Sequence, residues 1–198
     1  MDILNYEKYL EFIMDYINQK FEVQKEYIKC AKGCALCCKT IGVPFSELEF
    51  EYLIEGYNQL DDETKSIVDS KIKQLVSGNC EKECPFLINN ICSVYKYRGI
   101  ICRTFGLLTF SNIDGKDEYN IPFCVHKGLN YASVYDEETN SISSEKVTEL
   151  NYKEEPKFYA LDRSILFNLK LVRDLGLDFG VSRRLIDWLK DFENKREK

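Results

Sequence analysis

Apolar and charged positions alternate with the period of an α-helix at the start of the chain. This pattern predicts an amphipathic helix over about residues 3 to 28, with charged side chains on its opposite face. We expect the apolar stripe to pack on the core of the domain, and docking of a partner protein on this face is the alternative. The stripe consists of Leu10, Ile13, Met14, Ile17 and Phe21.

Two further helices are predicted from their start signals. Ser46, followed three residues later by Glu49, is a capping box, which predicts a helix that reaches about residue 59. An aspartate at position 61 or 62 caps the next helix, which carries apolar residues at helical spacing and stops at Gly78.

The middle of the chain changes character. Two short apolar segments, residues 85–88 and 91–95, flank Asn89 and Asn90, which predicts a small β-hairpin. Residues 104 to 123 have no regular pattern and carry a turn signal at Asp114-Gly115. Polar residues 131 to 155 are expected to contain a short β excursion.

Two helices are predicted to close the chain, over about residues 157 to 174 and about residues 182 to 196, the second capped by Ser182. The expected fold is therefore mainly α, with irregular cysteine-rich metal-binding loops and a small β-hairpin packed among about five helices. We expect a single domain over residues 1–198. Its metal-binding core is expected at 30–124, and helical segments flank it at 1–29 and 157–198.

Composition excludes several partners. The chain of 198 residues has a formal net charge of −6 and no basic stripe, so no general attraction for nucleic acid or an anionic membrane is expected. Charged residues interrupt any signal-peptide core near the start, and no stretch approaches the roughly 18 apolar residues that span a bilayer. We therefore expect a cytoplasmic protein.

Nine cysteines are the strongest chemical signal in the sequence. In a reducing compartment, such a set favours metal binding over disulfide bonds. Between two groups of cysteines lie 41 residues without one. The first group contains Cys30, Cys34, Cys37 and Cys38, and the second contains Cys80, Cys84, Cys92 and Cys102, followed by Cys124.

The spacing inside the first group suggests how a metal would be held. Cys34 and Cys37 form a Cys-x2-Cys turn, which lets two sulfurs converge on one ion while backbone amides face them. Cys38 follows Cys37 directly, so both can serve one centre only if the backbone kinks there or if the centre is larger than one ion. Gly33 supplies a position suited to positive φ. A four-iron cube tolerates diverging cysteines better than one zinc ion, and two zinc ions are another solution.

Other residues narrow the chemistry. An all-sulfur ligand set suits zinc, iron–sulfur or copper(I), and argues against magnesium, calcium or manganese. Arg98 and Arg103 lie among aromatic and apolar residues near the second group, where their charges would balance several thiolates. His126, the only histidine, could complete a site but is more often structural. Cys30 and Cys80 are candidates for cysteines that bind nothing and act as small apolar side chains.

The two groups together resemble the bacterial cysteine-cluster family of zinc- or iron-chelating proteins, the CxxCxxCC family. Its first motif resembles residues 30–38, and its second resembles Cys84-Pro-Phe-Leu, Cys92-Ser-Val-Tyr, Arg98-Gly and Cys102-Arg-Thr-Phe. The resemblance covers about residues 30 to 124. It implies a chelating domain whose ligands are Cys34, Cys37, Cys38, Cys84, Cys92, Cys102 and Cys124, with Cys30 as an eighth.

The chain departs from the family pattern at two places. Three residues instead of two separate Cys30 from Cys34, which weakens the case for Cys30 as a ligand. Gly99 stands where the family usually has proline, which loosens the local turn.

Three functions fit these features. The first is a metal-binding protein that holds a [4Fe–4S] cluster, or zinc, and exchanges electrons with a protein redox partner or senses redox state. The second is an enzyme, because flagellin lysine N-methylase is similar to the family in its cysteine motifs; the absence of a Gly-rich nucleotide-binding pattern argues against this. The third is a structural zinc module whose helices contact other proteins.

Overall fold

The computed structural model describes residues 3–39, 42–78, 83–113 and 116–196. Within it the chain forms two compact units, each assembled from segments that are distant in sequence. Unit 1 contains Lys32–Arg103 and Asp178–Lys198, together with the first three residues. Unit 2 contains Leu4–Ala31 and Thr104–Leu177. The single domain expected from the sequence stays a prediction.

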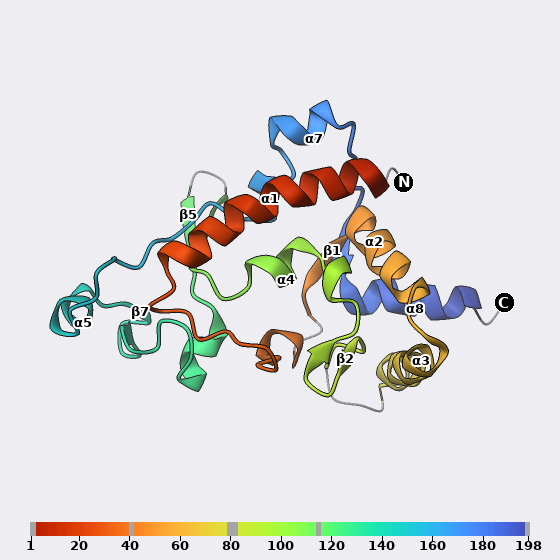
Figure 1. Cartoon of the computed structure of the whole chain (residues 1–198), viewed down its shortest axis with the longest axis horizontal. Helices are drawn as coiled ribbons and strands as arrows, with labels where there is room; N and C mark the ends of the chain where they lie inside the picture. The colour runs from red at the N-terminus through yellow and green to blue at the C-terminus, as the bar shows by residue number, and fades with distance from the viewer. Residues whose placement is uncertain (1–2, 40–41, 79–82, 114–115, 197–198) are drawn as a thin grey trace. The chain divides into compact units, whose positions relative to one another are not determined.

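Three helices form the frame of unit 1: α2 (Glu47–Asn58), α3 (Asp62–Val76) and α8 (Leu185–Arg196). The predicted capping box is confirmed at α2, where the Glu49 N–H donates to Ser46 Oγ at 3.2 Å and the Ser46 N–H donates to Glu49 Oε2 at 2.8 Å. Asp61 caps α3, as predicted, by accepting from the Thr64 N–H at 2.8 Å. In Figure 1, α3 and α8 lie side by side.

A short antiparallel strand pair connects the two distant segments of unit 1. Strand β1 (Pro44–Ser46) pairs with β8 (Ser182–Arg184). The prediction that Ser182 caps a helix over residues 182 to 196 is therefore wrong at its start, and α8 begins only at Leu185. Pairing with a distant strand determines this boundary, and the local sequence carries no signal for it.

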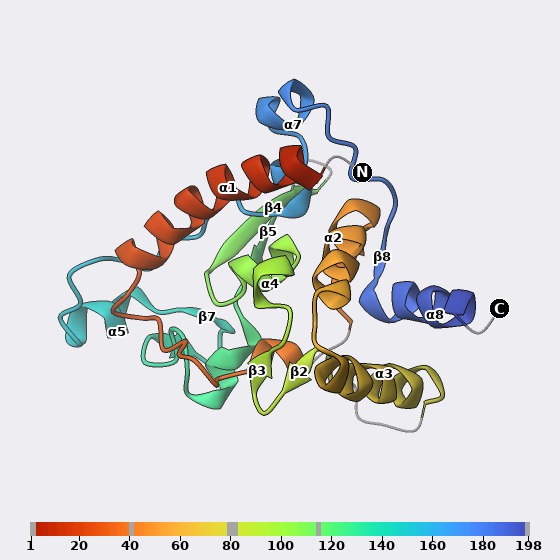
Figure 2. The ribbon, with the colours of Figure 1, turned by 45° about the vertical axis from the view of Figure 1, so that its right-hand side comes forward.

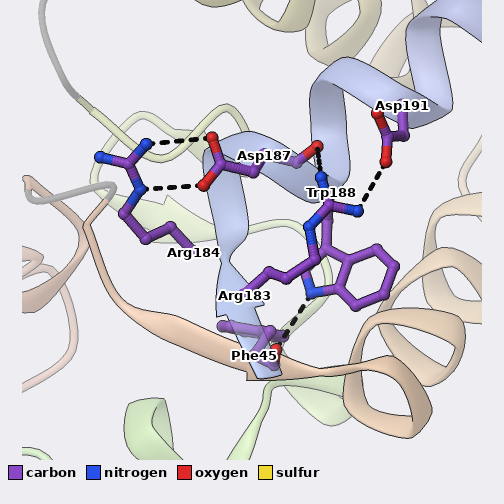
Figure 3. A network of polar contacts seen from close by, with 6 residues as sticks. All are labelled: Phe45, Arg183, Arg184, Asp187, Trp188 and Asp191. Carbon is purple, nitrogen blue, oxygen red and sulfur yellow. Dashed lines mark hydrogen bonds and ion pairs between the residues drawn. The ribbon is translucent and has the colours of Figure 1, made fainter. Parts of the chain in front are cut away.

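Polar contacts fasten α8 to β1, as Figure 3 shows. The Trp188 indole N–H donates to the Phe45 carbonyl at 3.0 Å. The Arg183 guanidinium lies 4.7 Å from the centre of the Trp188 ring and forms a 2.6 Å ion pair with Asp191. The bond to Phe45 holds the C-terminal helix against the segment that leads into α2, and the contacts of Arg183 join β8 to α8.

The apolar core of unit 1 lies among these helices. Three cysteines, Cys84, Cys92 and Cys102, are partly buried against it. Each fully buried apolar side chain contributes about 1.5–3 kcal/mol to the stability of the fold, so these cysteines pack against a stable part of unit 1. The core consists of Phe45, Phe50, Leu53, Tyr57, Val68, Ile72, Leu75, Phe86, Val94, Leu185 and Leu189.

The segment that carries the second cysteine group is compact. The predicted hairpin is confirmed as β2 (Leu87–Ile88) and β3 (Ile91–Cys92). Asn89 and Asn90, at φ 50° and 60°, provide the left-handed turn that such a hairpin favours. A 3₁₀ turn, η2 (Tyr95–Tyr97), and helix α4 (Ile100–Thr104) follow.

Helix α1 (Ile3–Val23) belongs mainly to unit 2 and ends five residues before the predicted limit. Its buried side chains include Leu10, Ile13 and Ile17 of the predicted stripe. Beyond α1, Tyr27 packs in a second core with Leu108, Tyr131, Val134 and Val147.

The prediction that residues 104 to 123 are irregular is wrong. Strands β4 (Thr109–Ile113) and β5 (Lys116–Asn120) form an antiparallel hairpin, visible in Figure 2. Every residue of β5 is exposed, so the strand lacks the apolar alternation that would reveal it. The turn predicted at Asp114-Gly115 lies outside the described residues. Strands β6 (Tyr135–Asp136) and β7 (Ser141–Ile142) confirm the predicted β excursion, and α5 (Ser144–Glu149) follows.

The helix predicted over residues 157 to 174 is also wrong as a single element. It is replaced by two short helices, α6 (Arg163–Leu166) and α7 (Lys170–Asp174). Tyr159 instead bonds to the neighbouring strand: its N–H donates to the Leu108 carbonyl, and its carbonyl accepts from the Phe110 N–H, both at 3.0 Å. Tertiary strand pairing thus overrides the local helical period.

Helices predominate in the described part of the chain, and the strands occur only as short antiparallel pairs. This supports the mainly α class, although eight α-helices replace the expected five or so because several are only one or two turns long. Among the described residues, no helix combines the length and apolarity that crossing a membrane requires.

Candidate metal centre

The predicted ligands divide between the two units. Unit 1 holds six of them, and unit 2 holds Cys30 and Cys124. Cys80 lies outside the described residues. The six in unit 1 are Cys34, Cys37, Cys38, Cys84, Cys92 and Cys102.

The first cysteine loop, which carries Cys34, Cys37 and Cys38, has the kink that two adjacent ligands require. Gly33 has φ 92°, as its position predicts, and Ala35 is also left-handed at φ 40°. The Cys38 N–H donates to the Ala35 carbonyl at 2.9 Å, and the chain continues into the 3₁₀ turn η1 (Leu36–Lys39). As a result, the sulfurs of Cys37 and Cys38 lie 3.9 Å apart.

The two cysteine groups touch directly in unit 1. The Cys84 N–H donates to the Cys38 carbonyl at 2.8 Å, which joins the first loop to the segment ahead of β2. Cys92 lies at the end of the β2–β3 hairpin, and Cys102 lies in α4. Segments far apart in the sequence therefore bring their thiols to one region of unit 1.

These thiols influence one another electrostatically. Burial, followed by the charge of Cys102, raises the pKa of Cys84. Burial also raises the pKa of Cys102 to about 12, with smaller contributions from Cys37 and Cys92. The contact with Cys38, followed by burial, raises the pKa of Cys37. Without a cation among them, the thiols resist ionisation, and a bound metal would remove that obstacle.

Positive charges oppose this effect. Arg98 lowers the pKa values of Cys37, Cys92 and Cys102, although burial, or for Cys37 the contact with Cys38, outweighs it. The Arg98 guanidinium stacks 3.5 Å from the centre of the Tyr95 ring, and its Nη1 donates to the Cys102 carbonyl at 3.4 Å.

Arg103 belongs to the same arrangement. Its Nε donates to the Arg98 carbonyl at 2.8 Å, and its Nη2 donates to the Lys96 carbonyl. Its charge also lowers the pKa of Cys92, whose overall shift is upward because of burial. The charge-balancing roles expected for Arg98 and Arg103 stay predictions, and their positions are compatible with them.

Backbone amides also face two of the sulfurs. Burial raises the pKa values of Cys84 and Cys92, and the Phe86 N–H lowers the first while the Val94 N–H lowers the second. In each case the donor lies two residues after the cysteine. Such N–H groups favour the charged thiolate, the form that binds metal.

Glu49 supports the turn before Cys102, and sequence analysis identified it only as a helix cap. Its side chain is fully buried, and its Oε1 accepts from the Ile100 N–H at 2.8 Å at the start of α4. A Cβ at position 99 would lie only 2.8 Å from the Phe45 ring and 3.2 Å from the Glu49 carboxyl. The backbone before Gly99 is extended, as proline favours, yet Phe45 fills the space that a proline ring needs.

The donor chemistry fits a soft metal such as zinc or iron. In the described part of the chain, however, no three cysteine, histidine or acidic side chains are placed to coordinate one ion. Closing the site on a metal would therefore need rotation of the thiol side chains about their χ1 bonds.

Cys30, in unit 2, has a different setting. Its side chain is exposed, and its sulfur accepts from Asn130 Nδ2 at 3.2 Å. Asn130 is fully buried, donates to the Gly106 carbonyl at 2.9 Å and accepts from the Lys29 N–H at 2.7 Å. Sequence analysis missed Asn130, because nothing in the local pattern marks it.

Cys124 is buried in the 3₁₀ turn η3 (Phe123–Lys127). His126 lies in the same turn and packs edge-on against Tyr135, with ring centres 5.1 Å apart. Ligand roles for Cys30, Cys124 and His126 stay predictions.

Comparison with known proteins agrees with the motifs. Residues 29–125 match the family CxxCxxCC, described as “Putative zinc- or iron-chelating domain”. No curated protein and no solved structure matches the chain. The matched segment encloses all nine cysteines. Residues 29–125 therefore belong to the CxxCxxCC family, whose description concerns zinc or iron chelation.

Proposed function

We propose that unit 1 binds a thiophilic metal through its cysteine side chains. The observation that carries this proposal is the hydrogen bond between the Cys84 N–H and the Cys38 carbonyl, because it joins two cysteine groups that are distant in sequence. The proposed ligands come from Cys34, Cys37, Cys38, Cys84, Cys92 and Cys102.

The chain's own residues prepare the thiols for this role. Burial and mutual repulsion keep the metal-free thiols protonated, so binding a cation releases protons. Arg98 offsets part of the negative charge that several thiolates would leave. The amides of Phe86 and Val94 favour the ionised form of Cys84 and Cys92, respectively.

Zinc is one candidate occupant, because the metal-free spacing of Cys37 and Cys38 is compatible with it. Two thiolates bound to one tetrahedral zinc at about 2.3 Å lie about 3.8 Å apart. The two sulfurs are separated by 3.9 Å. In a [4Fe–4S] cluster each cysteine binds its own iron, which separates neighbouring sulfurs further.

A [4Fe–4S] cluster is the alternative occupant. Unit 1 offers six thiols, more than the four that one zinc needs. A [4Fe–4S] cluster likewise needs four thiolates, and its role would be electron transfer to a protein partner or redox sensing. A reducing cytosolic location would keep these thiols available for either occupant.

Anaerobic purification of the full chain distinguishes these occupants. Zinc, iron and acid-labile sulfide are counted per chain, and visible absorption and EPR spectra are recorded. Stoichiometric zinc without colour supports the zinc site, and matched iron and sulfide support a cluster. A protein that retains no metal after loading with either zinc or iron plus sulfide contradicts the proposal.

A structural role for the metal is the second candidate, because Cys84, Cys92 and Cys102 pack against the core of unit 1. Removal of metal by a chelator, followed by circular dichroism, tests it. If metal removal abolishes cooperative unfolding, the metal is structural. If the helices survive, the metal serves a chemical or sensing role.

A further inference from the structure

Lys71 lies on α3, between the two cysteine groups in sequence and outside both motifs. Its ammonium group is 2.9 Å from Glu83 Oε1 and also donates to the Leu87 carbonyl. These two partners stand on either side of Cys84. The Lys71 side chain therefore contacts both ends of the segment that carries Cys84.

The segment between these contacts is itself short and bonded. The Leu87 N–H donates to the Cys84 carbonyl at 3.0 Å, and the Cys84 N–H donates to the Cys38 carbonyl at 2.8 Å. The segment contains five residues, so fixing Glu83 and Leu87 leaves Cys84 little freedom. The contacts at Glu83 and Leu87 therefore hold Cys84 in its position against the first cysteine loop.

Helix α3 is a rigid support for these contacts of Lys71. Val68, Ile72 and Leu75 on α3 are buried in the core of unit 1. Lys71 is about one-third exposed, as is Glu83, so water weakens their ion pair only in part. The second contact, to a backbone carbonyl, does not depend on a second charge.

Other lysines of α3 lack this connection. Lys65 donates to the Asn58 carbonyl at 2.7 Å, and Lys73 pairs with Glu193 on α8 at 3.7 Å. Both contacts link parts of the helical frame. Of the three, only Lys71 reaches the cysteine-bearing segment.

We propose that Lys71 is a positioning residue for the metal centre, because it holds the segment from Glu83 to Leu87 so that Cys84 stays against the first cysteine loop. This inference rests on the proposed function. Loss of outer contacts around metal ligands typically lowers metal affinity about 10–100-fold. Lys71 acts from outside the ligand set, so its loss should have an effect near the lower end of that range.

Three variants of the full chain test this inference: Lys71→Met, Lys71→Arg and, as a matched control on the same helix, Lys65→Met. Each is loaded with Co²⁺, and the thiolate-to-cobalt absorption band is followed while EDTA removes the metal. We expect Lys71→Met to release cobalt about 10-fold faster than the wild type. Lys71→Arg should restore most of the retention, and Lys65→Met should behave as the wild type.

The outcomes separate this inference from the proposed function. If the wild type forms no thiolate–cobalt band, the zinc version of the proposed function fails, and the role of Lys71 fails with it. If the wild type forms the band and Lys71→Met releases cobalt at the wild-type rate, only the role of Lys71 fails. If Lys71→Met and Lys65→Met release cobalt equally fast, the effect belongs to the stability of α3, which also overturns the role of Lys71. Urea unfolding of the metal-free variants identifies this last case.

Discussion

The cysteines of unit 1 and those of unit 2 differ in what surrounds them. In unit 1, the charge of Arg98 acts on Cys37, Cys92 and Cys102, and the ionisation of Cys84 is coupled to that of Cys102 and Cys92. In unit 2, Cys30 is exposed and bonded to an amide, whereas Cys124 is buried in a turn.

This difference shows that membership of a cysteine motif does not determine a thiol's environment. Gathering thiols in unit 1 is unfavourable without a cation, since burial and repulsion both oppose their ionisation. A fold that nevertheless gathers them is suited to a metal. The thiols of unit 2 have different surroundings, an amide contact for Cys30 and a buried turn for Cys124, so the two units can be tested by changing one at a time.

The largest expected effect comes from replacing a clustered cysteine. Cys84→Ser should lower metal affinity by more than the roughly 100-fold that loss of an outer contact can cost, because it removes a ligand. Cys124→Ser serves as the matched change in unit 2 and should keep most of the metal. Metal content after dialysis measures both, and equal loss in the two variants would break the comparison.

A smaller effect is expected from the buried carboxyl of unit 1. Glu49→Ala leaves the N–H groups of Ser46 and Ile100 without their acceptor, which should lower the free energy of unfolding by about 2–4 kcal/mol. Ser46→Ala removes only the hydroxyl cap and should cost about 1 kcal/mol. Urea unfolding of both variants checks this. Equal losses would mean that the contact with Ile100 contributes nothing.

The corresponding change in unit 2 is Asn130→Ala. It removes the contacts with Lys29, Cys30 and Gly106 and should lower the free energy of unfolding by about 1–3 kcal/mol. Metal retention should stay at the wild-type level, provided that it is measured where the variant is folded. Loss of metal under those conditions would show that Cys30 is a ligand and that the units are not independent.

The pH dependence of metal affinity is counted per released proton. Because the pKa of Cys102 is about 12 in the metal-free protein, and that of Cys84 is also raised, both are protonated at neutral pH. Each proton that metal binding releases should raise metal affinity about 10-fold per pH unit. Competition titrations between pH 6 and 8 measure this slope, and affinity that does not change with pH would contradict it.

The same shifts predict how the metal-free protein responds to alkali. Thiols in the unfolded chain ionise near pH 8.5, whereas the buried thiols remain protonated. The raised pKa values therefore contribute stability below about pH 8.5, and that contribution is lost as the pH rises toward the folded-state values. Bound metal should remove this loss.

Local signals in the sequence predicted part of the fold. The capping box at Ser46 and Glu49 and the aspartate at 61 located α2 and α3, since caps act within one turn. Strand β8 and the extended chain at Tyr159 were not predicted, because their pairing partners lie far away in sequence. The exposed strand β5 carries no apolar period at all.

The candidate site was predictable to a similar extent. Cysteine spacing identified the two groups, and Gly33 marked the kink in the first. The sequence did not reveal the bond between Glu49 and Ile100, because it depends on where α4 packs. It also did not reveal the contact of Lys71 with Leu87, because that depends on where the Glu83–Leu87 segment packs. Spacing therefore identifies candidate ligands, whereas the residues that support them depend on tertiary packing.

The central claim is that cysteines from both groups in unit 1 share one metal. X-ray absorption of the metal-loaded protein counts the sulfur neighbours of that metal. We predict about four sulfurs at about 2.3 Å in the wild type and a lower count in both Cys38→Ser and Cys84→Ser. A shell of oxygen or nitrogen alone, or a sulfur count that neither variant changes, would contradict the account.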